Sequence, residues 1–313
     1  MKKFTKLCLI VSLACVCIAA ICLGAGVAMG SGIKEVRTMA DAGAFNVGAL
    51  HIGSDGFYFG SEEVSSEDME IQEGTVNDSF AASEVDSLDI DIKYGEVYFI
   101  DSDSDQIQIS IDAPKRNVYK CKNENGTLTL KDKTSSYKWN TGMMNKHDVT
   151  VTIAIPKGKE FDEVTLITNA GSMEITHQFL ARELDLEVDA GELIGEQLEA
   201  KNDFSIDVGA GNLEIQNLQA KNLEVDCGVG EVNIGGKVSK KVDADCGVGQ
   251  ITMALIGNEN DYDYEINCGI GSVSINGTTY SSLATEQKID NNAGNKINLD
   301  CGVGEIDVTV KED

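Results

Sequence analysis

Proline, aromatic residues and basic residues are all scarce in this chain. Two of its 313 residues are proline and 6% are aromatic, whereas a compact β-sandwich of this length needs more large aromatic side chains to fill its core. Glycine is abundant, with 32 residues. Many glycines with little proline are typical of short strands that stack and turn at tight corners. The composition therefore argues against a compact sandwich.

The shortage of basic residues gives the chain a strong negative charge. It has 25 basic and 52 acidic side chains, and Lys2, Lys3 and Lys6 precede the first apolar run, so the remainder carries about −30 (22 − 52). Such a charge repels nucleic acid. It keeps an extended β-protein soluble, and it also attracts cations and basic partners in a salt-dependent way. We therefore expect no nucleic-acid partner, and we keep cationic peptides as candidate partners.

Residue types that build catalytic centres are few. The three histidines, His51, His147 and His177, lie far apart in the sequence and are each interpreted as surface residues. Some β-helices cleave polysaccharides with paired carboxylates. Three arginines and few aromatic residues to stack on sugars make this alternative weak. The sequence predicts no catalytic residue, no cofactor and no enzyme activity.

One acidic segment could suggest a calcium loop. Asp101-Ser102-Asp103-Ser104-Asp105 alternates carboxylates with hydroxyls, but it lacks the glycine and the distal glutamate of a helix-loop-helix calcium site. We interpret it as a polar turn before a strand, and the sequence predicts no metal site.

An uncharged, mostly apolar run extends over residues 7–32, 26 residues in all. It exceeds the roughly 7–15 residues of a secretory core and reaches the roughly 20 that span a membrane. We predict a cytoplasmic segment at 1–6, a transmembrane signal anchor at 7–29 and an extracellular linker or stalk at 33–84. This places the protein in the cell membrane as a single-pass protein with its C-terminal domain outside.

Two alternatives to a retained anchor stay open. Small residues at Gly26-Val27-Ala28 would allow cleavage by signal peptidase. Cys15 or Cys22 could be lipidated, although the residues before each are a poor match to the usual small-residue pattern.

The dominant feature of the sequence is a repeat of about 20 residues centred on a glycine. In one copy Leu184, Leu186 and Val188 alternate with acidic residues, so one face is apolar and the other is charged. Successive anchoring glycines are 20, 20, 19, 19, 22 and 33 residues apart. These glycines are Gly171, Gly191, Gly211, Gly230, Gly249, Gly271 and Gly304.

A repeat of this length predicts a solenoid. A single coil cannot bury its apolar face, but coils stacked about 4.8 Å apart hide it between neighbours. We predict an all-β, single-domain β-solenoid over residues 85–310, with positive φ at the corner glycines. Residues 276–295 are interpreted as an insertion between the last two coils.

The segment before the regular repeats has related strands. Residues 88–100 resemble an opening coil, and we expect strands at 106–111, 127–130 and 149–155. They form either a cap or wider first coils, since the ends of a solenoid need covering.

Four cysteines occupy one position in successive coils, where earlier copies have threonine or valine. A slot that accepts these residue types is best explained as a small inward core position. Disulfides between adjacent rungs are conceivable, whereas a linear ladder does not form the tetrahedron that zinc prefers. The cysteines are Cys227, Cys246, Cys268 and Cys301.

These motifs together resemble a bacterial family of adhesin-like β-strand-repeat domains of unknown function. The matching segments are Tyr94-Gly95-Glu96-Val97, the strand ending in Pro156-Lys157-Gly158, and the Asp-x-Gly-x-Gly repeats, which span roughly residues 85–310. The resemblance implies a non-enzymatic envelope protein behind a membrane segment, and some members are connected with envelope stress. We therefore expect an adhesin-like or envelope interaction module with envelope proteins as partners, or alternatively an envelope-stress sensor that binds cationic peptides.

Overall fold

The computed structural model describes residues 46–47, 50–53, 56–59, 71–114, 117–133, 149–280 and 285–312. They belong to two compact units, each described by itself. The first contains a small antiparallel sheet of β1 (Asn46–Val47), β2 (Leu50–Gly53) and β3 (Gly56–Phe59). The predicted anchor at 7–29 lies outside the described residues, and among those that are described no helix is long and apolar enough to cross a membrane.

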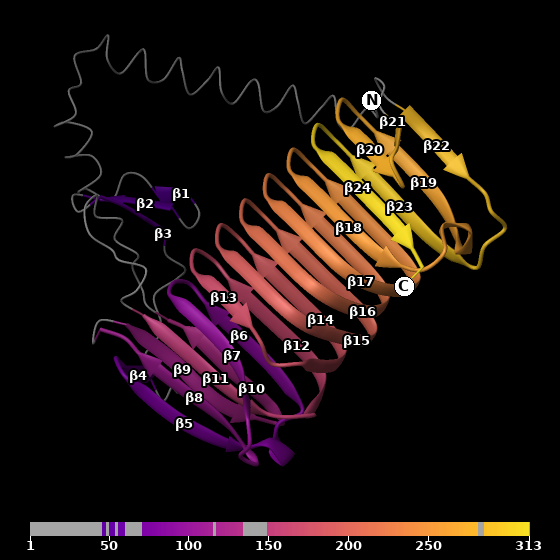
Figure 1. Cartoon of the computed structure of the whole chain (residues 1–313). Coiled ribbons are helices and arrows are strands. Elements are labelled where there is room, and N and C mark those ends of the chain that lie inside the picture. Colours follow the sequence, from indigo (N-terminus) through magenta and orange to yellow (C-terminus); the bar gives the residue numbers. More distant parts are fainter. Residues whose placement is uncertain are drawn as a thin grey trace, which may run out of the picture. The chain divides into compact units, whose positions relative to one another are not determined.

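The second unit is all-β and has the form of a solenoid, with successive coils stacked side by side (Figure 1). Neighbouring coils pair in parallel through three short segments; in β15 and β16 these segments begin at 192 and 212, 197 and 217, and 203 and 222. The strands of the coils are β6 (Ser87–Ile92), β7 (Glu96–Ser102), β12 (Glu160–Thr168), β13 (Ser172–Ile175), β14 (Phe179–Val188), β15 (Glu192–Val208), β16 (Asn212–Cys227), β17 (Glu231–Cys246), β18 (Gln250–Ile256), β19 (Tyr262–Cys268), β20 (Ser272–Ile275), β23 (Asn295–Cys301) and β24 (Glu305–Lys311).

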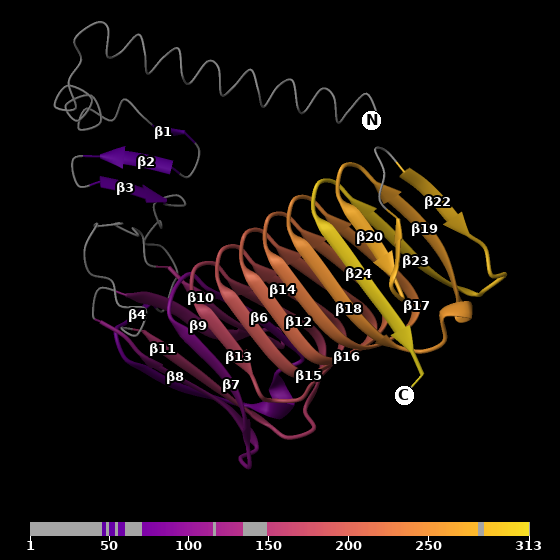
Figure 2. The same cartoon turned by 45° about the horizontal axis from the view of Figure 1, so that its top comes forward.

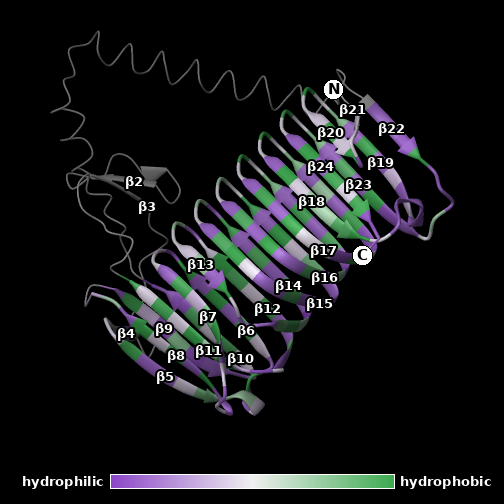
Figure 3. Ribbon diagram, viewed as in Figure 1, coloured by the Kyte–Doolittle hydropathy of each residue, from purple (hydrophilic) through white to green (hydrophobic). Residues whose placement is uncertain are grey.

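The core lies inside the coils because apolar residues alternate with polar ones along the strands of the coils (Figure 3). Leu186, Ile206 and Val225 pair in register and are almost fully buried. Each such side chain stabilises the fold by about 1.5–3 kcal/mol when removed from water. The same inward position holds an apolar residue in coil after coil, so the stack shares one continuous core.

The C-terminal coil does not take its place in sequence order. β17 and β18 pair with β23 and β24, which in turn pair with β19 and β20. The coil of Gly304 therefore lies between the coils of Gly249 and Gly271, as the bright yellow β24 between β18 and β20 shows in Figure 1. Residues 276–295 lie between the last two repeats in the sequence, as expected, but the two coils that they join are stacked in the reverse of sequence order. The described part of this segment includes two short strands, Thr278–Tyr280 and Thr285–Ile289, which pair with the outermost coil.

Antiparallel strands cover both ends of the stack (Figure 2). At the C-terminal end, β21 pairs with β20 and β22 pairs with β19. At the other end, β9 pairs with β10 and β4 pairs with β9 on one side of the solenoid. On the other side, β8 pairs with β11 and β5 pairs with β8. These strands are β4 (Ile71–Glu73), β5 (Val76–Ala81), β8 (Gln106–Asp112), β9 (Val118–Glu124), β10 (Thr127–Asp132), β11 (Thr150–Pro156), β21 (Thr278–Tyr280) and β22 (Thr285–Ile289).

The strands expected before the regular repeats are confirmed as β8, β10 and β11, and residues 87–102 form the first coil. The cap also recruits residues that the sequence analysis placed in the linker. Residues 71–84 form β4, β5 and the 3₁₀ turn η1 (Ala82–Glu84), and they belong to the solenoid unit. A second 3₁₀ turn, η3 (Glu259–Asp261), precedes β19.

The corner glycines stack in one column, but the physical reason predicted for them is wrong. Only Gly95, in the first coil, has a positive φ, of 121°. At the others a Cβ atom would collide with the neighbouring coil: at Gly230 it would lie 2.2 Å from the carbonyl oxygen of Gly211. Close approach of two backbones, not backbone conformation, requires glycine here. In spatial order the column is Gly95, Gly171, Gly191, Gly211, Gly230, Gly249, Gly304 and Gly271.

Candidate functional site

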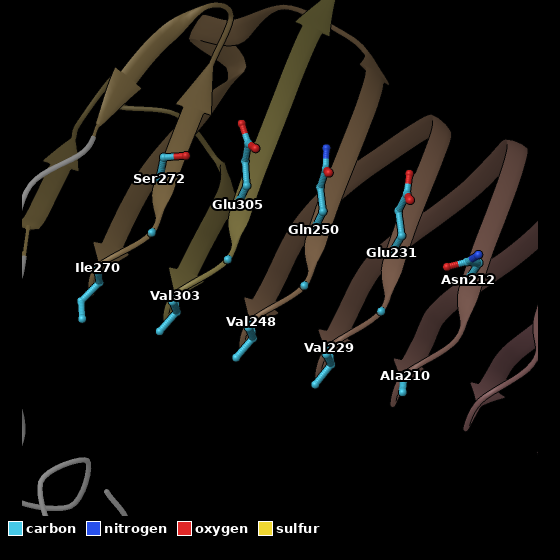
Figure 4. Close-up of a pocket in the computed structure, with 14 residues that line it drawn as sticks. Ala210, Asn212, Val229, Glu231, Val248, Gln250, Ile270, Ser272, Val303 and Glu305 are labelled. Atoms are coloured by element: carbon cyan, nitrogen blue, oxygen red, sulfur yellow. The ribbon is translucent and has the colours of Figure 1, made fainter.

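An exposed row of branched apolar side chains follows the glycine corner along the C-terminal coils (Figure 4). Each is the middle residue of a Gly-x-Gly segment, and its amide donates a 2.8 Å hydrogen bond to a glycine carbonyl of the adjacent coil. Val229 is 66% exposed and Ile270 is 71% exposed. We call this row the apolar stripe; in spatial order it consists of Val229, Val248, Val303 and Ile270.

A shallow groove runs beside the apolar stripe. Its floor is formed by Gly230, Gly249, Gly304 and Gly271, which have no side chains to fill it. Its far wall is a row of polar residues that pair in register, of which Glu231, Gln250 and Glu305 extend in the same direction (Figure 4). We call them the polar row: Asn212, Glu231, Gln250, Glu305 and Ser272.

Carboxylates flank the other side of the same corner. They pair in register on β15, β16, β17 and β23 and border a second open groove. Burial, followed by the neighbouring carboxylates, raises the pKa of Asp226 and of Asp245. We call this set the acidic row: Asp207, Asp226, Asp245 and Asp300. No lysine or arginine borders either groove among the residues that the structure describes.

Lowering the pH from 7 towards 4 is expected to relieve repulsion in the acidic row. The folded pKa values of Asp226 and Asp245 lie above the ordinary 3.8, so the folded protein favours their protonated forms. Protonation of these two carboxyl groups therefore stabilises the fold fully when the pH is below 3.8. This stabilisation is lost as the pH rises through the folded pKa values. The double variant Asp226→Asn/Asp245→Asn should therefore raise the free energy of unfolding by about 1 kcal/mol at pH 7, and the gain should vanish near pH 4.

Urea unfolding at both pH values measures this effect. Glu196→Gln is the control, because Glu196 is an exposed carboxylate outside the acidic row. A gain in stability that is the same at both pH values would contradict the assignment of the repulsion to this row.

The four repeat cysteines lie on the inner side of the corner. All are buried with free thiols, and they pair in the spatial order Cys227, Cys246, Cys301, Cys268. The Cys227 thiol donates to the carbonyl oxygen of Gly230, at 3.2 Å. Its sulfur also occupies the space beside Gly249, since a Cβ atom added at Gly249 would lie 2.8 Å from Sγ of Cys227. Cysteine and glycine columns therefore pack into one another.

One histidine contradicts the interpretation of all three as surface residues. His177 is fully buried, with Nδ1 2.7 Å from a carboxylate oxygen of Asp101 and its ring edge-on to Phe179. Burial lowers the pKa of His177, although Asp101 opposes the shift. The imidazole is therefore neutral near pH 7 and donates from Nδ1. Its role is to join the first two coils, where its amide also donates to the carbonyl oxygen of Phe99.

Of the segment 101–105, residues 103–105 form the predicted polar turn between β7 and β8, where Lys157 Nζ lies 3.0 Å from Oδ1 of Asp103, whereas Asp101 and Ser102 end β7. Within the described ranges, no group of three or more histidine, cysteine, aspartate or glutamate side chains could hold a metal ion.

The apolar stripe was missed by sequence reasoning. Corners are expected to be polar, and the repeat was interpreted through its glycines and cysteines. A signal was present, since the residue before the anchoring glycine changes from alanine at 170, 190 and 210 to valine and isoleucine in the later copies. Exposed apolar side chains in one line mark contact surfaces.

Comparison with known proteins places the repeats in a family. The family model described as Toastrack DUF4097 matches residues 85–309. Solved structures similar to the chain include a proposed adhesin from Bacteroides fragilis, with 16% identity, 76% of this chain and 98% of that chain covered, and a TM-score of 0.40. A proposed cell adhesion protein from Clostridium sporogenes has 14% identity, covers 76% of this chain and 100% of its own, and has a TM-score of 0.34. No curated protein matches the chain.

Proposed function

The chain belongs to the Toastrack DUF4097 family, which confirms the resemblance to an adhesin-like repeat family, and we propose that it is a non-enzymatic, adhesin-like interaction module at the cell surface. The apolar stripe carries this proposal. Four large apolar side chains in a line, each more than half exposed, are costly to leave in water. They suit a surface that a partner covers.

The shape of the corner supports contact over catalysis. Small-molecule sites are usually concave and enclose most of their ligand. The two grooves here are open and floored or bordered by glycine. Such a surface follows the stack and can match an extended partner, as in other repeat proteins.

We also propose that the apolar run at 7–29 holds the solenoid outside the membrane. The motive is the asymmetry of charge: Lys2, Lys3 and Lys6 precede the run and the acidic bulk follows it. Protease added to intact cells should digest residues 33–313 while a cytosolic marker stays intact. Digestion of these residues only after permeabilisation would reject this orientation.

A second candidate function is an envelope-stress sensor that binds cationic peptides. The acidic row favours it, because carboxylates in register concentrate negative potential along one line. Titration of the full-length protein with polylysine at low and high salt tests this function. Binding that weakens with salt supports it, and the absence of salt-sensitive binding removes it.

A further inference from the structure

We propose that the groove between the apolar stripe and the polar row is a docking site for a basic, amphipathic α-helix of a partner, lying along the stack. The inference rests on the proposed interaction function and names the partner class. Three features of the corner lead to it: an apolar wall, carboxylates on both flanks, and the spacing of the rungs.

The apolar wall of the groove requires an apolar face on the partner. Val248 and Val303 are 59% and 56% exposed, and both border the groove together with Val229 and Ile270. Backbone hydrogen bonds to the adjacent coils hold these residues in line. A partner that covers them must present apolar side chains in a line of matching length.

The acidic residues on the two flanks of the groove favour a partner with positive charge. Glu231 and Glu305 are exposed on the polar row, and the acidic row lies on the other side of the stripe. A second copy of this chain would bring carboxylates against carboxylates, and an anionic membrane would also be repelled. Lysine or arginine on both borders of the partner's apolar face would complement the corner.

The spacing of the rungs selects a helix over a strand. Rungs recur about every 4.8 Å, and the turns of an α-helix about every 5.4 Å. Across the four stripe residues this gives about 14 Å of stripe against about 16 Å of helix, so one apolar side chain per turn stays beside one rung. Side chains on one face of a strand recur about every 6.7 Å and fall out of step.

The test uses a synthetic 18-residue peptide of leucine, alanine and lysine, with the leucines on one helical face and lysines on both borders. A scrambled peptide has the same composition and charge without that face. We expect the amphipathic peptide to bind the full-length protein in detergent and to gain far-ultraviolet helical signal on binding. The variant Val248→Asn/Val303→Asn should bind it about tenfold or more weakly.

The control variant is Ala254→Asn/Thr309→Asn, since these residues pair in register on the same two coils and lie outside the groove. It should bind as the wild type does. The proposal is overturned if the scrambled peptide binds equally well, or if the Val248→Asn/Val303→Asn protein keeps full affinity. If either result came with peptide binding that weakens strongly with salt, the acidic row would be the binding surface. The proposed interaction function would then still stand.

Discussion

Gly230→Ala is expected to destabilise the solenoid by about 3 kcal/mol, near the upper end of the usual cost of overpacking a tight interior. The new Cβ atom would lie 2.2 Å from the carbonyl oxygen of Gly211 and 2.7 Å from Cγ1 of Val208. The oxygen belongs to a backbone that is hydrogen-bonded to coils on both sides, so it cannot move away cheaply. Urea unfolding monitored by circular dichroism measures the loss.

Gly294→Ala is the matched control. A Cβ atom at Gly294 meets nothing within 4 Å, and this residue is not among the positive-φ glycines. Replacing such a glycine by alanine reduces the freedom of the unfolded chain and is neutral or stabilises by up to about 1 kcal/mol. If both variants changed stability equally, close contact between coils would not be the reason for the glycine column.

Removing residues 295–313 is expected to separate the outermost coil from the rest of the stack. β19 would keep only β22 as a partner, and β20 would keep only β21. Each buried apolar side chain of the removed coil, β23 and β24, contributes about 1.5–3 kcal/mol in the intact protein. They are Ile297, Leu299, Cys301, Ile306, Val308 and Val310.

Thiol labelling under native conditions measures the separation. Cys246 and Cys268 are each 3% exposed in the intact stack, where both pair with Cys301. Truncation should make both react rapidly with a maleimide, as located by mass spectrometry, while Cys227 stays protected. Removal of residues 312–313 alone is the control and should change nothing. Continued protection of Cys246 and Cys268 after the larger truncation would mean that the two coils can stack directly.

Sequence reasoning succeeded where the determinant is local. Period-two alternation set which side of each strand faces inward, as at Leu186 and its partners, and the recurring glycine located the corners. The cap strands at 106–112 and 150–156 were recognised for the same reason. It failed at His177, since a single polar residue has no pattern to show that Asp101 will meet it in the interior.

By itself, then, the sequence determined the family, the repeat and the acidic outer surface, because each is written in neighbouring residues. Only the tertiary structure decided the order of the last two coils. Both contain Cys-Gly-x-Gly followed by a similar strand, so either coil could pair with β17. Residues 276–294 are long enough for the later coil to stack directly on β17, with the earlier coil outside it. Tertiary structure likewise decided why the glycines are needed and that four separate side chains form one apolar stripe, because both depend on what the adjacent coil places within a few ångströms.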